Sequence, residues 1–155
     1  SKYGFLDVLE EEMDKVFPFD FEINWDKKNH AVEVAFLLEV QNTGGVALVD
    51  EAGEESDEDI FFEEAVIFYN PTKSHVEEDA YLTAIPYEPK KGLSREFLAY
   101  FAIFLRDTAE LALDELMDFL ADEEAESFEI IWNQEVFEEG KAGLEEGEFY
   151  PYPRY

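Results

Sequence analysis

The side chains most able to do chemistry in this sequence include a dense acidic run, DEAGEESDED over residues 50–59. A calcium-binding loop needs oxygen ligands at alternating positions, a glycine at the sixth position and a bidentate glutamate at the twelfth. Counted from Asp50 the sixth residue is Glu55, and counted from Asp57 it is Phe62, so neither register fits. We interpret the run as a solvated loop. The alternative is a metal site formed by Asp50, Glu54, Asp57 and Asp59.

The second group is the one dense cluster of basic residues, which lies in the segment 90–95. We expect a long helix to begin at its end, and the free amides and dipole of a helix N-terminus favour an anion. The alternative is that these cations pair with the acidic surface of the protein itself. No glycine-rich phosphate-binding loop accompanies the cluster. The predicted anion-binding residues are Lys90, Lys91, Ser94 and Arg95.

The remaining candidates argue against an enzyme. His30 and His75 are the only histidines, and neither has the spacing of a metalloprotease site. Glu63 and Glu64 fall next to each other on an expected strand, so they face opposite ways and cannot act as an acid–base pair. No serine stands in the context of a nucleophile elbow, and cysteine is absent. We therefore predict no catalytic residue and no cofactor.

Charge and composition narrow the class of protein. The chain has 155 residues, with 40 Asp and Glu against 11 Lys and Arg, for a formal net charge of -29. Such a surface repels nucleic acid and anionic membranes within about 8 Å in physiological salt, and it favours basic partners. The hydrophobic content of 46% can fill the core of one domain. No secretory signal or transmembrane segment is visible, so we expect a cytoplasmic protein.

The element that must organise the fold is a helix over 94–121. Its apolar residues recur at steps of three and four, which places them on one helical face. Ser94 is a good N-cap for this helix. Acidic residues follow the opposite face at steps of four. The apolar face consists of Leu98, Phe101, Leu105, Ala109, Ala112, Leu116 and Leu120.

Alternating patterns predict that the rest of the chain is mostly strands. A first helix over 5–17 should end at Pro18. Strands are expected over 19–26 and 32–40 as a hairpin, and then over 46–49, 60–69, 81–87 and 128–132, with a short helix after Asn133. Pro86 and Pro89 indicate that the strand over 81–87 either leaves the sheet or lies at its edge. We predict one α+β domain over 1–155, with an antiparallel sheet of about five to six strands, an N-terminal helix and the long central helix packed on one face, and an extended tail over 148–155.

Several long strings are similar to those of a known family. They are KYGFLDVLEEEMDKVF from Lys2, WDKKNHAVEV from Trp25, IPYEPKKGLSREFLAYF from Ile85, MDFLADEE from Met117 and the terminal EFYPYPRY. Over nearly its whole length the chain resembles a family of uncharacterised small acidic proteins from lactic-acid bacteria, enterococci and streptococci. The resemblance implies a bacterial cytoplasmic protein. The family is a domain of unknown function, so the resemblance implies no activity and no site.

Three hypotheses about function follow from these observations. The first is a non-enzymatic interaction module that presents its acidic surface to a basic protein or peptide, although that surface could also serve only for solubility. The second is a chaperone-like homodimer that holds apolar segments, suggested by the aromatic residues of the strand over 60–69. The third is an enzyme or anion-binding protein that uses the helix start from Lys90 to Arg95.

Overall fold

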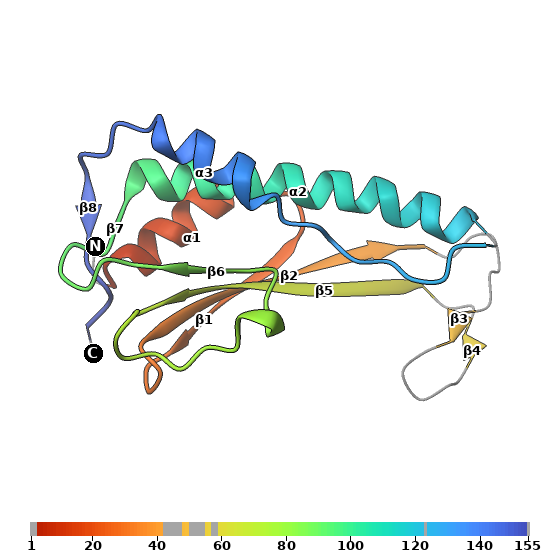
Figure 1. The fold of residues 1–155 in the computed structure, drawn as a ribbon, viewed down its shortest axis with the longest axis horizontal. Coiled ribbons are helices and arrows are strands. Elements are labelled where there is room, and N and C mark those ends of the chain that lie inside the picture. The colour runs from red at the N-terminus through yellow and green to blue at the C-terminus, as the bar shows by residue number, and fades with distance from the viewer. Residues whose placement is uncertain (1–2, 42–47, 50–54, 57–58, 123, 155) are drawn as a thin grey trace.

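The computed structural model describes residues 3–41, 48–49, 55–56, 59–122 and 124–154. Figure 1 shows their arrangement, with helices on one face of a sheet and the chain termini together at one end of the molecule. The elements, in chain order, are α1 (Phe5–Val16), β1 (Asp20–Asp26), β2 (Ala31–Val40), β3 (Leu48–Val49), β4 (Glu55–Ser56), β5 (Ile60–Tyr69), the 3-10 turn η1 (Glu78–Ala80), β6 (Thr83–Pro86), β7 (Leu93–Ser94), α2 (Arg95–Ala121), α3 (Gln134–Ala142) and β8 (Phe149–Tyr150).

The main sheet has the strand order β1-β2-β5-β6. The predicted α+β class is confirmed, with its N-terminal helix and long central helix. Two details of the sheet differ from the prediction. Among the described residues it has four strands, and β6 runs parallel to β5 rather than antiparallel. A strand parallel to its neighbour must run in the same direction, so the chain has to return along the sheet before it begins. The chain over 70–82, which includes η1, is long enough to make this crossover from the end of β5 to the start of β6.

The core lies between the sheet and the helices α1 and α2. Strand β2 buries alternate side chains along most of its length, because successive residues of a strand point to opposite faces, whereas β5 buries three consecutive residues, Val66, Ile67 and Phe68. Strand β2 lies inside the sheet, between β1 and β5. The largest fully buried side chains include Phe5, Leu9 and Met13 of α1, Phe36 and Leu38 of β2, Phe68 of β5, and Phe97, Leu98, Phe101 and Leu105 of α2.

The start of α2 is confirmed at the residue that the sequence indicated. The Ser94 hydroxyl accepts a hydrogen bond from the Phe97 N–H at 3.0 Å, which is the expected N-cap contact. The C-terminal tail pairs with the chain just before this helix, because β8 forms a two-stranded sheet with β7. Beyond β8 the Tyr152 ring stacks on Tyr87 at 5.1 Å, and its hydroxyl accepts a hydrogen bond from Trp25 Nε1 at 2.7 Å.

The predicted strand over 128–132 is wrong. This segment belongs to no sheet among the described residues, although its burial alternates as in a strand. It runs between α2 and the edge of the main sheet (Figure 1), and the Phe128 ring packs against Phe62 of β5 at 5.1 Å. The short helix after it is confirmed as α3, capped by Asn133 Oδ1, which accepts from the Val136 N–H at 3.2 Å. No helix in the described part of the chain is long and apolar enough to cross a membrane.

Candidate binding groove

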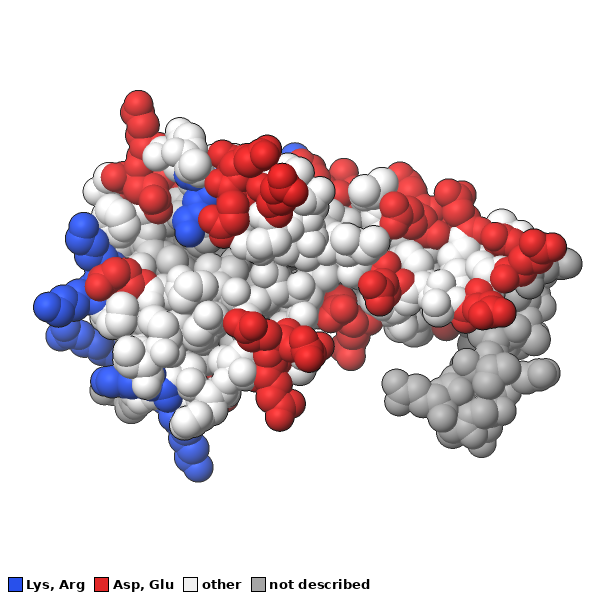
Figure 2. Space-filling model, in the orientation of Figure 1, with Lys and Arg blue, Asp and Glu red and all other residues white. Residues whose placement is uncertain are grey.

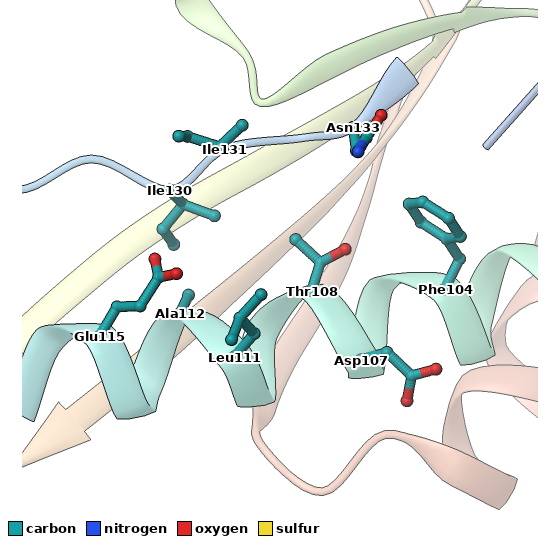
Figure 3. Close-up of a pocket in the computed structure, with 9 residues that line it drawn as sticks. All are labelled: Phe104, Asp107, Thr108, Leu111, Ala112, Glu115, Ile130, Ile131 and Asn133. Atoms are coloured by element: carbon teal, nitrogen blue, oxygen red, sulfur yellow. The ribbon is translucent and has the colours of Figure 1, made fainter. Parts of the chain in front are cut away.

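A groove of about 400 Å³ lies between the outer side of α2 and the segment after it. Figure 3 shows Thr108, Leu111 and Glu115 pointing from α2 toward this segment, and Ile130 pointing back toward α2. The residues that line the groove are Phe104, Asp107, Thr108, Leu111, Ala112, Glu115, Ile130, Ile131 and Asn133.

Helical spacing explains one wall of the groove and strand-like spacing explains the other. Phe104, Thr108, Leu111 and Glu115 are three or four residues apart, so they lie on one face of α2. On the other wall the side chains alternate, since Ile130 is only 7% exposed whereas Ile131 is 72% exposed. The groove therefore has a buried apolar floor, which includes Ala112 and Ile130, and exposed apolar side chains on its walls, Leu111 and Ile131.

Two large aliphatic side chains of the groove are largely in water. Leu111 is 60% exposed, and Ile131 on the opposite wall is more exposed still. Single exposed apolar residues are common, but apolar residues that meet around a hollow with charged edges are typical of binding surfaces. Sequence analysis did not select this site. The sequence did contain a signal for it. Leu111 and Ile131 are apolar, although the helical pattern of 94–121 and the alternating pattern of 128–132 predict that their side chains face solvent.

The electrostatics of the groove are one-sided. No Lys or Arg occurs between Arg106 and Lys141, so negative charge is uncompensated along the second half of α2 and the segment that follows. In Figure 2 acidic side chains continue to the right end of the molecule, while most of the visible basic side chains gather at the left end. Asp107 at the rim accepts a hydrogen bond from Arg106 Nε at 3.1 Å. Glu115 forms no ion pair with another described residue.

Two further hollows lie beside the edge strand β1. One, of about 430 Å³, is bounded by Glu10 and Asp14 of α1, by β1 and by the residue before it. The other, of about 350 Å³, lies on the sheet face, over Ala35 and Leu37, with Glu22 at its rim. Both have carboxylates around apolar side chains. Neither has the two exposed aliphatic walls of the groove beside α2.

At the start of α2, the basic residue Arg95 of the predicted anion site forms ion pairs within the protein. Arg95 forms ion pairs with Glu11 at 3.0 Å, Glu12 at 3.7 Å and Glu148 at 3.0 Å. Hydrogen bonds with Tyr150 and then with Glu11 raise the pKa of this guanidinium, so it stays charged. These contacts join α1, α2 and the tail. Arg95 is therefore committed to the carboxylates of its own chain, which is the alternative that the sequence left open.

The other residues of the predicted anion site are also engaged or exposed. The Ser94 hydroxyl, besides its N-cap contact, donates to Glu146 Oε1 at 2.8 Å. The backbone N–H groups of Lys90 and Lys91 both donate to the carboxylate of Glu88. The Lys91 ammonium lies 5.3 Å from the ring centre of Phe149, and Lys90 is exposed. The arrangement brings the four predicted residues together, but it surrounds them with carboxylates, and anion binding there stays a prediction.

A second carboxylate holds the tail at this helix start. Glu96 Oε1 accepts hydrogen bonds from the backbone N–H groups of Gly147 at 2.7 Å and Glu148 at 3.0 Å. The bonds from Glu148 and then from Gly147 lower the pKa of Glu96. The first turn of α2 therefore binds the chain over 146–150 rather than offering free groups to a ligand.

The alternative metal site cannot be followed in the structure. Asp50, Glu54 and Asp57 lie outside the described residues, and Asp59 is exposed at the start of β5. No group of three or more possible metal ligands occurs among the residues that the structure describes. The two histidines lie in adjoining loops, where Ser74 Oγ donates to the His30 carbonyl at 3.1 Å and the His75 N–H donates to Asn29 Oδ1 at 2.8 Å.

Comparison with known proteins identifies relatives but no activity. A family model described as a protein of unknown function (DUF3013) matches residues 1–154. The fold is similar to the crystal structure of a conserved protein of unknown function from Enterococcus faecalis, with a TM-score of 0.85 and 36% sequence identity, over 97% of this chain and 96% of that chain. No curated protein matches the chain. The resemblance seen in the sequence is confirmed, and no function has been assigned to these relatives.

Proposed function

The chain belongs to the DUF3013 family of proteins of unknown function, and we propose that it is a non-enzymatic module that binds a basic segment of a partner protein in the groove beside α2. The observation that carries this proposal is the meeting of exposed Leu111 and Ile131 around a hollow within a cation-free stretch of chain. We place this function in the cytoplasm, the location that the sequence predicts.

The chemistry of the groove selects for a partner that is both apolar and positive. The floor removes apolar side chains from water, which is worth roughly 25 cal/mol per Å² of buried apolar area. Glu115 supplies a carboxylate that points into the space between the two walls (Figure 3). The surrounding negative surface also speeds the approach of a basic partner and repels an acidic one. A segment with Leu or Val beside Lys or Arg satisfies both requirements.

A second copy of the same chain is the competing occupant, since exposed apolar residues also motivated the homodimer hypothesis. Pairing through the groove would bring two predominantly acidic surfaces together, and like charges across an interface are costly. This repulsion favours a basic partner over self-association. Light scattering across protein concentration and salt measures the difference, and a stable dimer at low salt would favour the second copy.

Binding of a fluorescein-labelled peptide of alternating Lys and Val tests the proposal by fluorescence anisotropy. Leu111→Ser should weaken binding roughly tenfold, because burying this side chain is worth about 1.5 kcal/mol. Met117→Ser is the matched control, since Met117 is 54% exposed on α2 and does not line the groove. Failure of the Lys–Val peptide to bind, or equal effects of the two substitutions, would refute the groove as the binding site.

A second pair of variants separates groove electrostatics from net charge. Glu115→Gln and Glu110→Gln each remove one negative charge from α2, but only Glu115 lines the groove. We expect Glu115→Gln to weaken binding of the Lys–Val peptide several-fold and Glu110→Gln to change it little, with both effects reduced by salt. A Glu–Val peptide of the same pattern should not bind.

A further inference from the structure

The chain over 128–131 has the sequence pattern and burial of a strand but is paired with no strand that the structure describes. Phe128, Ile130 and Trp132 are buried or half-buried, whereas Glu129 and Ile131 are exposed. No backbone N–H or C=O group of residues 128–131 forms a hydrogen bond with the backbone of another described residue. The neighbouring carbonyls differ, since that of Trp132 accepts from Gln134 and that of Asn133 accepts from Phe137.

We propose that the basic partner segment binds as an added β-strand along residues 128–132, a mode that rests on the function proposed above. Side chains of this segment alternate between core and solvent, so its N–H and C=O groups point sideways, along the molecular surface. The groove lies along that surface, between residues 130–133 and α2. An extended peptide in the groove therefore meets unpaired backbone groups on one flank and the side chains of α2 on the other.

The register of an added strand defines the chemistry of the partner. Its alternate side chains point to the same two faces as those of residues 128–132. Side chains on the inner face would pack over Ala112 and Ile130 and are therefore apolar. Side chains on the outer face would pass the exposed Ile131 and Glu129, so Lys or Arg fits there, with its aliphatic stem over Ile131 and its charge near Glu129. The partner is an extended segment in which Val, Leu or Ile alternates with Lys or Arg.

The same argument disfavours a second copy of this chain as the added strand. The corresponding segment, ESFEIIW over residues 126–132, carries two glutamates and no cation. Two copies would place those glutamates near each other, and like charges on paired strands destabilise a ladder. We therefore do not expect a homodimer through this edge, but the test must be able to detect one.

N-methylation of the Lys–Val peptide at alternate residues, in two complementary patterns, tests strand addition. Each extended peptide directs alternate N–H groups to one flank, so one pattern blocks the bonds to residues 128–132 and the other blocks none of them. We expect the first pattern to weaken binding at least tenfold relative to the second. Amide hydrogen exchange over 128–132 should slow at alternate residues when the unmodified peptide binds.

The outcomes separate this inference from the function on which it rests. If the unmodified peptide binds at the groove but both methylation patterns have equal effect, or if exchange over 128–132 does not change, strand addition is overturned while the binding function stands. If the unmodified peptide does not bind, both proposals fall. Protection of these amides by increasing protein concentration alone would identify a second copy as the added strand and overturn the proposed partner.

A charge reversal supplies a variant with a matched control. Glu129→Lys places a positive charge on the outer face of the proposed strand pair and should weaken binding of the Lys–Val peptide at least fivefold. Glu63→Lys makes the same change of charge at the rim of the hollow on the sheet face. It should weaken binding less, through net charge alone. The reverse order of effects would place the peptide beside β1 and overturn the inference.

Discussion

Substitution of Gly92 by alanine tests whether the C-terminal tail is held as the structure shows. Gly92 has a φ of 79°, a conformation that residues with a Cβ atom rarely adopt. An added Cβ would overlap the carbonyl oxygen of Tyr150 and would lie 2.7 Å from Pro151 Cα. Both neighbours are backbone atoms, so no rotation of a side chain can make room. The tail must move away from β7.

The expected cost has two parts. A residue with a Cβ atom in the left-handed region is destabilised by roughly 1–2 kcal/mol relative to glycine. Displacement of the tail also disturbs the pairing of Leu93 with Tyr150, where each lost hydrogen bond costs about 1 kcal/mol. Together these effects predict a loss of about 2–4 kcal/mol. For a domain of this size that loss lowers the melting temperature by roughly 4–16 °C.

Urea unfolding and thermal melts, followed by circular dichroism, measure this loss. Gly147→Ala is the matched control, because no atom lies within 4 Å of a Cβ built at Gly147 and its φ is not in the left-handed region. We expect this control to stay within about 0.5 kcal/mol of the wild type. Equal stability of the two variants would refute the reasoning and would mean that the tail is not packed against Gly92.

Two further predictions concern charge. Burial raises the pKa of Glu64, against a smaller opposing effect of the Ala65 N–H, so the folded state binds a proton at Glu64 more tightly than the unfolded state does. Glu64→Gln should therefore stabilise the protein at pH 7 relative to Glu63→Gln. Thermal melts across pH should show this advantage disappearing as the pH falls below 4.5, the ordinary pKa of a glutamate. Added sodium chloride at pH 7 should raise the melting temperature, because it screens the repulsion that a net charge of -29 produces; a decrease would mean that local ion pairs such as those of Arg95 outweigh net repulsion.

Local patterns in the sequence determined the elements themselves. The helix from Arg95 to Ala121, its Ser94 cap and the strand from Ile60 to Tyr69 were all readable, because periodicity and capping depend on residues a few positions apart. The end of the first helix before Pro18 was readable for the same reason, since proline lacks the N–H that a helix interior needs. The edge position of β6 is one of the two outcomes that Pro86 and Pro89 indicated.

The tertiary structure decided which elements meet. The strand pattern over 128–132 reflects side chains that alternate between core and solvent, but a ladder also needs a neighbouring backbone, and that neighbour is not encoded in the segment itself. The parallel pairing of β6 with β5 depends on the path of a long crossover. Likewise, Arg95 could have bound an external anion until the fold brought Glu11 and Glu148 to it. The groove is decided in the same way, because its two walls become a site only when packing sets them side by side.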